Sequence, residues 1–280
     1  MSTLVAFHAH PDDECITTAG TLAKAVDDGH RVVIVYATRG EHGEVPEGLL
    51  RPGETLVERR MDEVRRSTDA IGVHRVEFLG YRDSGMMGTP ENDEPGSFWR
   101  ADVDEAVERL AAILRDERPD VLLVYDVNGN YGHPDHLQVH RVGVRAGELV
   151  GVPHVLEATM NRDVIRAFMA LLVETGAANW EDVPDLDDPD VLFAMPDAVI
   201  TTRVDVRPWA ERKRASMAAH ETQVGDLAPF LAMPLDKFRE AMGTEYFIRR
   251  GVPSDHRDDD VFAGVEHVVA ARDPRAVDQG

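Results

Sequence analysis

The feature that most limits what this chain can fold into is an apolar segment followed directly by a group of acidic residues. Residues 3–7 have the composition of a buried strand, and His10-Pro11-Asp12-Asp13-Glu14 follows almost at once. A helical pattern begins within this motif and covers residues 13–28. Carboxylates held this close together repel as anions, because each charge raises the pKa of its neighbour. A bound cation removes that conflict, so the segment predicts a metal site at a strand-to-helix junction.

Short β-branched segments alternate with helical patterns through about residue 160. Strands are expected at 3–7, 31–36, 75–79, 121–125 and 155–158, and helices at 13–28, 55–71, 102–117 and 134–150. This alternation predicts an α/β fold with a Rossmann-like, mostly parallel sheet flanked by helices. The first junction lacks the G-x-G-x-x-G run of a dinucleotide-binding sheet, which argues against a nucleotide site there.

The alternation of predicted strands and helices becomes less regular after residue 160. A helix is expected at 162–174, a strand at 198–203 and a helix at 208–220, with an acidic stretch near 181–190 between them. We therefore expect a catalytic core at 1–180. A smaller C-terminal portion at 181–280 is expected to belong to the same continuous domain.

The acidic composition narrows the class of partner. The chain has 30 basic and 52 acidic residues and a formal net charge of −22, which argues against nucleic acid or anionic lipid. No apolar run approaches the roughly 20 residues of a membrane span, and the single cysteine, Cys15, excludes an internal disulfide. These features predict a cytoplasmic protein that acts on a small molecule, and they leave a homo-oligomer open.

A second strand-to-helix junction repeats the chemistry of the first. Residues 125–136 read Tyr-Asp-Val-Asn-Gly-Asn-Tyr-Gly-His-Pro-Asp-His and follow the strand expected at 121–125. In a sheet of order 3-2-1-4-5-6, strands one and four are neighbours, and ligands bind in the crevice at their carboxyl ends. The two clusters are therefore predicted to meet.

His10, Asp13 and His136 form the predicted set of metal ligands. Two histidines and a carboxylate suit zinc, with Fe²⁺ as the alternative, and three protein ligands leave an open position typical of a catalytic site. His140, four residues after His136, is an alternative ligand, but we favour a packing or supporting role for it.

The other polar residues of the motifs have candidate roles in proton transfer. Asp12 can accept the proton of an attacking water, and His133 can face an oxyanion and a leaving amine. Tyr131 can add a phenolic donor, and Asp135 can hold a histidine in one tautomer. Each His-Pro-Asp run also fits an ordinary helix cap, but two such junctions favour a site. Glu14 is expected to be structural or supporting.

The paired motifs resemble those of a known family. Residues 9–14, Ala-His-Pro-Asp-Asp-Glu, and 132–136, Gly-His-Pro-Asp-His, are similar to the signatures of the zinc-dependent PIG-L/LmbE-like deacetylases. Arg82-Asp83-Ser84-Gly85-Met86 and Ala219-His220-Glu221-Thr222-Gln223-Val224 resemble the mycothiol-pathway branch. That branch contains an N-acetylglucosaminyl-inositol deacetylase and a mycothiol S-conjugate amidase.

The resemblance implies a zinc-dependent hydrolase that removes an N-acetyl group from an N-acetylglucosamine-type small molecule. It also implies substrate contacts by Arg60, Asp83, His220 and Glu41. The C-terminal portion at 181–280 would complete the substrate pocket. Four alternatives stay open: an amidase of mycothiol S-conjugates, a deacetylase of a natural-product intermediate, a zinc-dependent hydratase or lyase, and a metal-binding protein without turnover.

Overall fold

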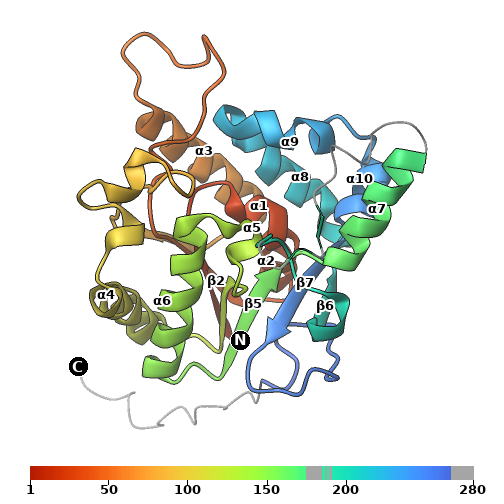
Figure 1. The fold of residues 1–280 in the computed structure, drawn as a ribbon. Helices are drawn as coiled ribbons and strands as arrows, with labels where there is room; N and C mark the ends of the chain where they lie inside the picture. The colour runs from red at the N-terminus through yellow and green to blue at the C-terminus, as the bar shows by residue number, and fades with distance from the viewer. Residues whose placement is uncertain (175–184, 187, 189–190, 266–280) are drawn as a thin grey trace, which may run out of the picture.

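The computed structural model describes residues 1–174, 185–186, 188 and 191–265. Within these residues, seven strands form one sheet in the order β3-β2-β1-β4-β5-β7-β6, and helices cover both faces (Figure 1). The strands are β1 (Thr3–His8), β2 (Arg31–Tyr36), β3 (Arg75–Phe78), β4 (Val121–Tyr125), β5 (His154–Thr159), β6 (Thr202–Asp205) and β7 (Thr244–Arg249). The pairings among β1 to β5 are parallel, whereas β7 runs antiparallel to both β5 and β6.

Ten α-helices lie in the described residues. They are α1 (Asp13–Thr17), α2 (Ala19–Asp27), α3 (Leu56–Ile71), α4 (Val103–Glu117), α5 (Gly129–Gly132), α6 (Pro134–Val150), α7 (Arg162–Glu174), α8 (Ala210–Ala219), α9 (Val224–Leu231) and α10 (Leu235–Met242). The predicted α/β class and the parallel sheet flanked by helices are confirmed. The expected strand order holds as far as β5, after which β7 and β6 complete the sheet.

The two-residue period of the strands builds two cores. Val5, Phe7, Val33 and Val35 belong to the cluster that includes apolar residues of α4 and α6. The alternate residues Leu4, Ala6, Val32 and Ile34 belong to the cluster with apolar residues of α2 and α3. Successive side chains of a strand point to opposite faces, so a strand covered on both sides is apolar throughout.

The helix expected at 13–28 is two helices with a break at Thr18. Thr18 has a φ of −136°, and its hydroxyl lies 3.2 Å from His8 Nε2. The carboxylate of Glu245 on β7 accepts the backbone N–H groups of Gly20 at 2.9 Å and Thr21 at 2.8 Å. These bonds satisfy a new helix N-terminus, because the first N–H groups of a helix have no partner within it.

Several segments differ from the sequence-based expectation after residue 190. The strand expected at 198–203 is β6 at Thr202–Asp205, and Asp197–Val199 form a short 3₁₀ turn before it. Strand β7 and the helices α9 and α10 were not predicted. The acidic stretch 181–190 lies mostly outside the described residues.

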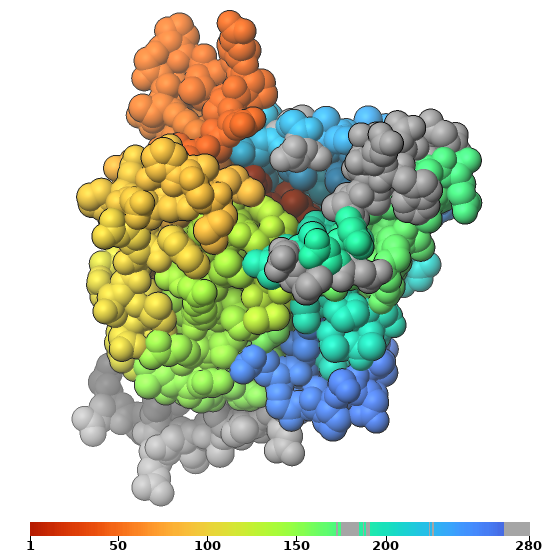
Figure 2. Space-filling model, viewed as in Figure 1, coloured from red at the N-terminus to blue at the C-terminus, as the bar shows by residue number. Residues whose placement is uncertain are grey.

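The carboxyl ends of β1 and β4 lie side by side at one edge of the sheet, since Leu4 pairs with Val121 and Ala6 with Leu123. This register brings the two His-Pro-Asp motifs together, as predicted. Figure 2 shows part of the N-terminal segment, in red, at the bottom of a hollow between later parts of the chain. In the part of the chain that the structure describes, no helix combines the length and apolar character needed to cross a bilayer.

Candidate metal and catalytic site

The first junction is a strained turn in which the side chain of the cap residue, Asp12, does not cap the helix. Asp12 precedes α1 with a φ of 105° and a ψ of −28°, and its side chain makes no cap hydrogen bond. A non-glycine residue in this region costs about 1–3 kcal/mol and persists only where its surroundings hold it. The carboxylate of Asp13 accepts the backbone N–H of His10 at 2.7 Å, which closes the turn. The Asp12 side chain is therefore free to face the cavity.

The second junction is a regular helix start. His133 caps α6, because its Nδ1 accepts the backbone N–H of Asp135 at 3.1 Å, and Pro134 occupies the first turn. The buried carboxylate of Asp126 holds the preceding loop by accepting the N–H groups of Asn128 at 2.9 Å and Asn130 at 3.1 Å. The cap is thus a histidine, and the Asp135 carboxylate is left to bind elsewhere.

His10 of the first junction is oriented by Asp135 of the second. Its Nε2 is 3.0 Å from Asp135 Oδ2 and 3.5 Å from Asp83 Oδ1. Asp135 is itself fixed by Ser84, whose backbone N–H donates to it at 2.9 Å and whose hydroxyl donates a further short hydrogen bond. A carboxylate that takes the outer N–H of a histidine leaves the other nitrogen as a metal ligand. The contact between His10 Nε2 and the Asp135 carboxylate is the one that the predicted orienting role of Asp135 requires.

The inner faces of His10 and His136 converge on Asp13. His10 Nδ1 is 3.6 Å from Asp13 Oδ2, and His136 Nε2 is 3.2 Å from Asp13 Oδ1. Two ligand atoms on a tetrahedral zinc lie about 3.4 Å apart, because each zinc–ligand bond is about 2.1 Å long. The donor types fit zinc, and the two separations, each to a different oxygen of Asp13, are close to this value.

Among the described residues, two groups of donors come close enough to share one ion through a single atom of each residue, and Asp13 belongs to neither. His10, His133 and His136 form one, and His10, Asp83 and Asp135 the other. In the first, His133 is partly occupied as the cap of α6. In the second, His10 Nε2 is already taken by the Asp135 carboxylate. The predicted set of His10, Asp13 and His136 differs from both groups, because Asp13 faces His10 with Oδ2 and His136 with Oδ1.

Electrostatics separate the roles of the neighbouring groups. Burial opposes ionisation of Asp13, but the nearby His136 and His10 outweigh it and hold the pKa of this carboxyl well below its ordinary value. Burial raises the pKa of Asp12 to about 6, with Asp13 adding to the rise and Arg60 opposing it. Burial, together with His10 and His136, lowers the pKa of His133 to about 2. His133 is therefore a neutral imidazole, and Nε2 carries its proton because Nδ1 accepts a hydrogen bond.

A cavity of about 570 Å³ opens above these residues. It is lined by His10, Asp12 and Asp13, by residues 42–46, by Arg60, by Asp83, Gly85 and Met86, by Tyr131 and His133, and by Thr222, Gln223 and Gly225. Tyr131 is 41% exposed, and its hydroxyl lies 3.3 Å from His136 Nε2. The size is in the range of small-molecule sites.

The residues assigned to substrate by resemblance occupy different positions. Asp83 lines the cavity, and so does Arg60, which is buried and forms an ion pair with Asp12 Oδ2 at 3.1 Å. Glu41 turns away and accepts the backbone N–H of Asp83 at 3.0 Å. His220 is fully buried, is not among the lining residues, and lies 2.7 Å from Glu14 Oε1.

Several residues near the site were not assigned roles from the sequence. Ser84 lay within a motif that we quoted, but its bonds to Asp135 could not be foreseen. Ser67, in the middle of α3, donates to Glu14 Oε1 at 2.6 Å and gives no sequence signal. His140, for which we favoured a packing or supporting role, lies 3.0 Å from the Tyr125 carbonyl through its Nδ1.

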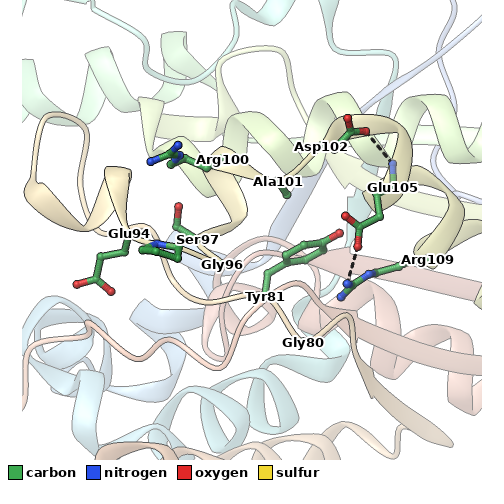
Figure 3. A pocket seen from close by; sticks show the side chains of 11 residues that line it. Gly80, Tyr81, Glu94, Gly96, Ser97, Arg100, Ala101, Asp102, Glu105 and Arg109 are labelled. Atoms are coloured by element: carbon green, nitrogen blue, oxygen red, sulfur yellow. Dashed lines mark hydrogen bonds and ion pairs between the residues drawn. The ribbon is translucent and has the colours of Figure 1, made fainter.

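A second hollow of about 450 Å³ lies between the start and the end of the segment that joins β3 to α4 (Figure 3). Its charged groups are already partnered. Arg109 lies over the Tyr81 ring at 4.6 Å and bonds to Glu105 at 2.5 Å, and Asp102 caps α4. Neither metal-donor group of the described residues lies here, so the chemistry gathers at the first cavity.

Comparison with known proteins identifies the family of this chain. A family model described as "PIG-L: GlcNAc-PI de-N-acetylase" matches residues 5–147, which is more than half of the chain. This chain belongs to the PIG-L family. The resemblance inferred from the two motifs is thereby confirmed.

Relatives match over nearly the whole length. A 1D-myo-inositol 2-acetamido-2-deoxy-alpha-D-glucopyranoside deacetylase of Geodermatophilus obscurus is 42% identical, covering 94% of this chain and 97% of its own. A protein of the same name from Acidothermus cellulolyticus is also 42% identical, over 95% of this chain and 96% of its own.

Solved structures share the fold at low identity. The N,N'-diacetylchitobiose deacetylase of Pyrococcus horikoshii has a TM-score of 0.57 at 22% identity, covering 96% of this chain and 88% of its own. The 4-carboxy-2-hydroxymuconate hydratase GalB of Pseudomonas putida KT2440 has a TM-score of 0.56 at 18% identity, covering 90% and 98%. The fold thus occurs in proteins named for two reaction types, so the reaction of this chain has to be argued from the residues of its site and not from the fold.

Proposed function

We propose that this chain is a metal-dependent N-deacetylase that acts on an N-acetylglucosaminyl-inositol. The observation that carries the proposal is that Asp12 and His133 line the same cavity as the donors His10 and Asp13. Amide hydrolysis needs a base for the water and a donor for the oxyanion, and these two residues supply both. The names of the relatives supply the substrate.

The proposed metal ligands are His10, Asp13 and His136, with zinc as the metal and Fe²⁺ as the alternative. Their separations of 3.6 and 3.2 Å support this set. When bound, the ion supplies Lewis acidity, which polarises the amide carbonyl and makes a water molecule more acidic.

Asp12 is the proposed general base. A carboxyl with a pKa near 6 is mostly ionised at pH 7, yet it is a stronger base than an ordinary aspartate. The Arg60 guanidinium, 3.1 Å away, holds the carboxylate in one position. Asp12 takes a proton from the attacking water and later returns it to the departing amine.

His133 is the proposed oxyanion donor. Its neutral ring presents an Nε2–H group, because Nδ1 is held by the N–H of Asp135. A donor fixed in this way needs no rearrangement when negative charge develops on the carbonyl oxygen. Tyr131, at the mouth of the cavity, would give a second donor to the same oxygen.

Asp83 is the proposed contact for the sugar. Its Oδ2 accepts the His42 N–H at 3.1 Å and its Oδ1 the Gly85 N–H at 2.9 Å, which fixes the carboxylate at the cavity wall. A fixed carboxylate can accept hydrogen bonds from sugar or inositol hydroxyl groups. The acidic lining also suits a neutral substrate whose product is a cationic amine.

Kinetics on three substrates test the proposal. We expect N-acetylglucosaminyl-inositol to release acetate and free amine in equal amounts, with kcat/KM above about 10⁴ M⁻¹s⁻¹, the lower end of typical enzymes. N-acetylglucosamine and a mycothiol S-conjugate should react more slowly. Faster cleavage of the conjugate would make the chain an amidase of that class, and hydration of a double bond without amine release would contradict the proposal.

A further inference from the structure

The carboxylate of Glu14 lies directly behind the proposed base and is fully buried. Its Oε2 accepts the backbone N–H of Asp12 at 3.0 Å. Its Oε1 accepts the Ser67 hydroxyl at 2.6 Å and lies 2.7 Å from His220 Nε2. We propose that Glu14 is a positioning residue that fixes the backbone of Asp12, and that Ser67 and His220 hold Glu14 in place. The inference rests on the proposed role of Asp12.

The peptide between Pro11 and Asp12 is held at both of its polar groups. Arg60 donates a short hydrogen bond to the Pro11 carbonyl, and Glu14 accepts the Asp12 N–H. Two opposed hydrogen bonds fix the plane of this peptide. They therefore fix the direction in which the Asp12 side chain leaves the backbone, and Arg60 also contacts that side chain at 3.1 Å.

The conformation of Asp12 requires such support. Its φ of 105° is unfavourable for a residue with a Cβ, and no side-chain cap bond offsets the cost. A turn without these anchors would relax toward a negative φ. That change would swing the carboxylate away from the cavity while leaving the neighbouring Asp13 ligand on α1.

Glu14 can act as an anchor because other elements hold it. Ser67 comes from α3, and its hydroxyl also lies 2.7 Å from Ser216 on α8. His220 follows α8, and its Nδ1 has no hydrogen-bond partner among the described residues. The ring of His220 is therefore oriented through its contact with Glu14. This arrangement gives His220 a function without a position at the substrate.

Glu14→Gln is the first test. A glutamine has the same size but one acceptor oxygen, so it cannot accept from both Asp12 and the pair formed by Ser67 and His220. We expect kcat on N-acetylglucosaminyl-inositol to fall about 10- to 100-fold, the size of effect that a misplaced reacting group produces. KM and metal content should stay within about twofold, because binding and ligation are not changed.

Glu63→Gln is the matched control. Glu63 is also a fully buried carboxylate, and it accepts the Thr222 N–H at 2.9 Å and the Thr222 hydroxyl at 2.6 Å without contacting Asp12. A general loss of buried hydrogen bonds should lower the melting temperature of both variants. Because Thr222 lines the cavity, Glu63→Gln is expected to change KM, so kcat is the deciding readout. Only Glu14→Gln should lower kcat, and an equal loss of kcat in Glu63→Gln would overturn the inference.

A double-mutant cycle tests whether Glu14 acts through Asp12. In an Asp12→Asn background, Glu14→Gln should change kcat less than about twofold, because residues that act as a unit are not additive. A full, independent loss in that background would contradict the positioning role.

A crystal structure of Glu14→Gln decides the inference even if the proposed substrate is wrong. We expect residue 12 to leave its positive φ or its side chain to leave the cavity. An unchanged residue 12 would overturn the inference whatever the enzyme hydrolyses. If wild-type protein releases no acetate while residue 12 does move, the proposed function fails and the positioning role stands.

Discussion

The junctions after β1 and β4 have similar residues but different geometry. After β1, Asp12 stands at the cap position of a five-residue helix without capping it, and its backbone is strained. After β4, His133 caps the 17-residue helix α6 in an ordinary conformation. The helix start after β1 therefore lacks the stabilisation of a side-chain cap at Asp12, whereas the helix start after β4 has such a cap at His133.

This difference follows from what each junction supplies. The first provides Asp12 and Asp13, two adjacent carboxylates that must point to separate places, and an unstrained helix start would use one of them as a cap. The second provides His133, which can cap through Nδ1 and still present Nε2 to the cavity. A histidine has two separate polar atoms for two tasks, so no strain is needed.

The largest effect should come from Asp13→Ala at the strained junction. Asp13 is the carboxylate that approaches both His10 and His136, so its removal should empty the metal site and abolish turnover. Elemental analysis of the purified variant measures this. Metal bound at the wild-type level would remove Asp13 from the ligand set.

Asp12→Asn, one residue earlier, should distinguish the role of the Asp12 carboxylate from that of Asp13. The amide keeps the shape but cannot accept the proton, so kcat should fall about 10²- to 10⁴-fold with metal content unchanged. Single-turnover rates on metal-loaded protein measure the loss. A variant that lacks metal but regains full activity when zinc is added would show that the roles of Asp12 and Asp13 are exchanged.

His133→Ala should give a mixed effect at the regular junction. The loss of an oxyanion donor should lower kcat about 10²-fold or more, and the loss of the α6 cap should cost about 1 kcal/mol of stability. Steady-state kinetics and chemical denaturation measure the two effects. A change confined to KM would make His133 a binding residue.

The smallest effect should come from Asp83→Ala at the cavity wall. Loss of one or two hydrogen bonds to the sugar should lower kcat/KM about 10-fold, mainly through KM, on N-acetylglucosaminyl-inositol. The comparison with N-acetylglucosamine, which lacks the inositol, shows which ring Asp83 contacts. An unchanged kcat/KM on both substrates would remove Asp83 from the substrate site.

The sequence was sufficient for the parallel half of the fold and for the convergence of the motifs. Buried parallel strands are continuous apolar runs, and the neighbouring positions of β1 and β4 follow from the strand order. Strand β7 was missed because its inward face carries Glu245, which looks exposed in the sequence. Its charge is buried against Lys213 at 2.6 Å.

The supporting residues could not be foreseen for a related reason. Glu14 and His220 are 206 positions apart, and their contact depends on how α8 packs on α1 and α3. Arg60 was assigned to the substrate by resemblance, but its contacts with Pro11 and Asp12 appear only in three dimensions. Motifs show which residues carry the chemistry, whereas the residues that hold them come from anywhere in the chain.

Anomalous diffraction from crystals of the zinc-loaded protein tests the central claim most directly. The account predicts one strong peak per chain, bound by His10, Asp13 and His136, with the Asp12 carboxylate beside the ion but not coordinated to it. A peak bound instead by His10, Asp83 and Asp135, or by the three histidines without Asp13, would contradict it.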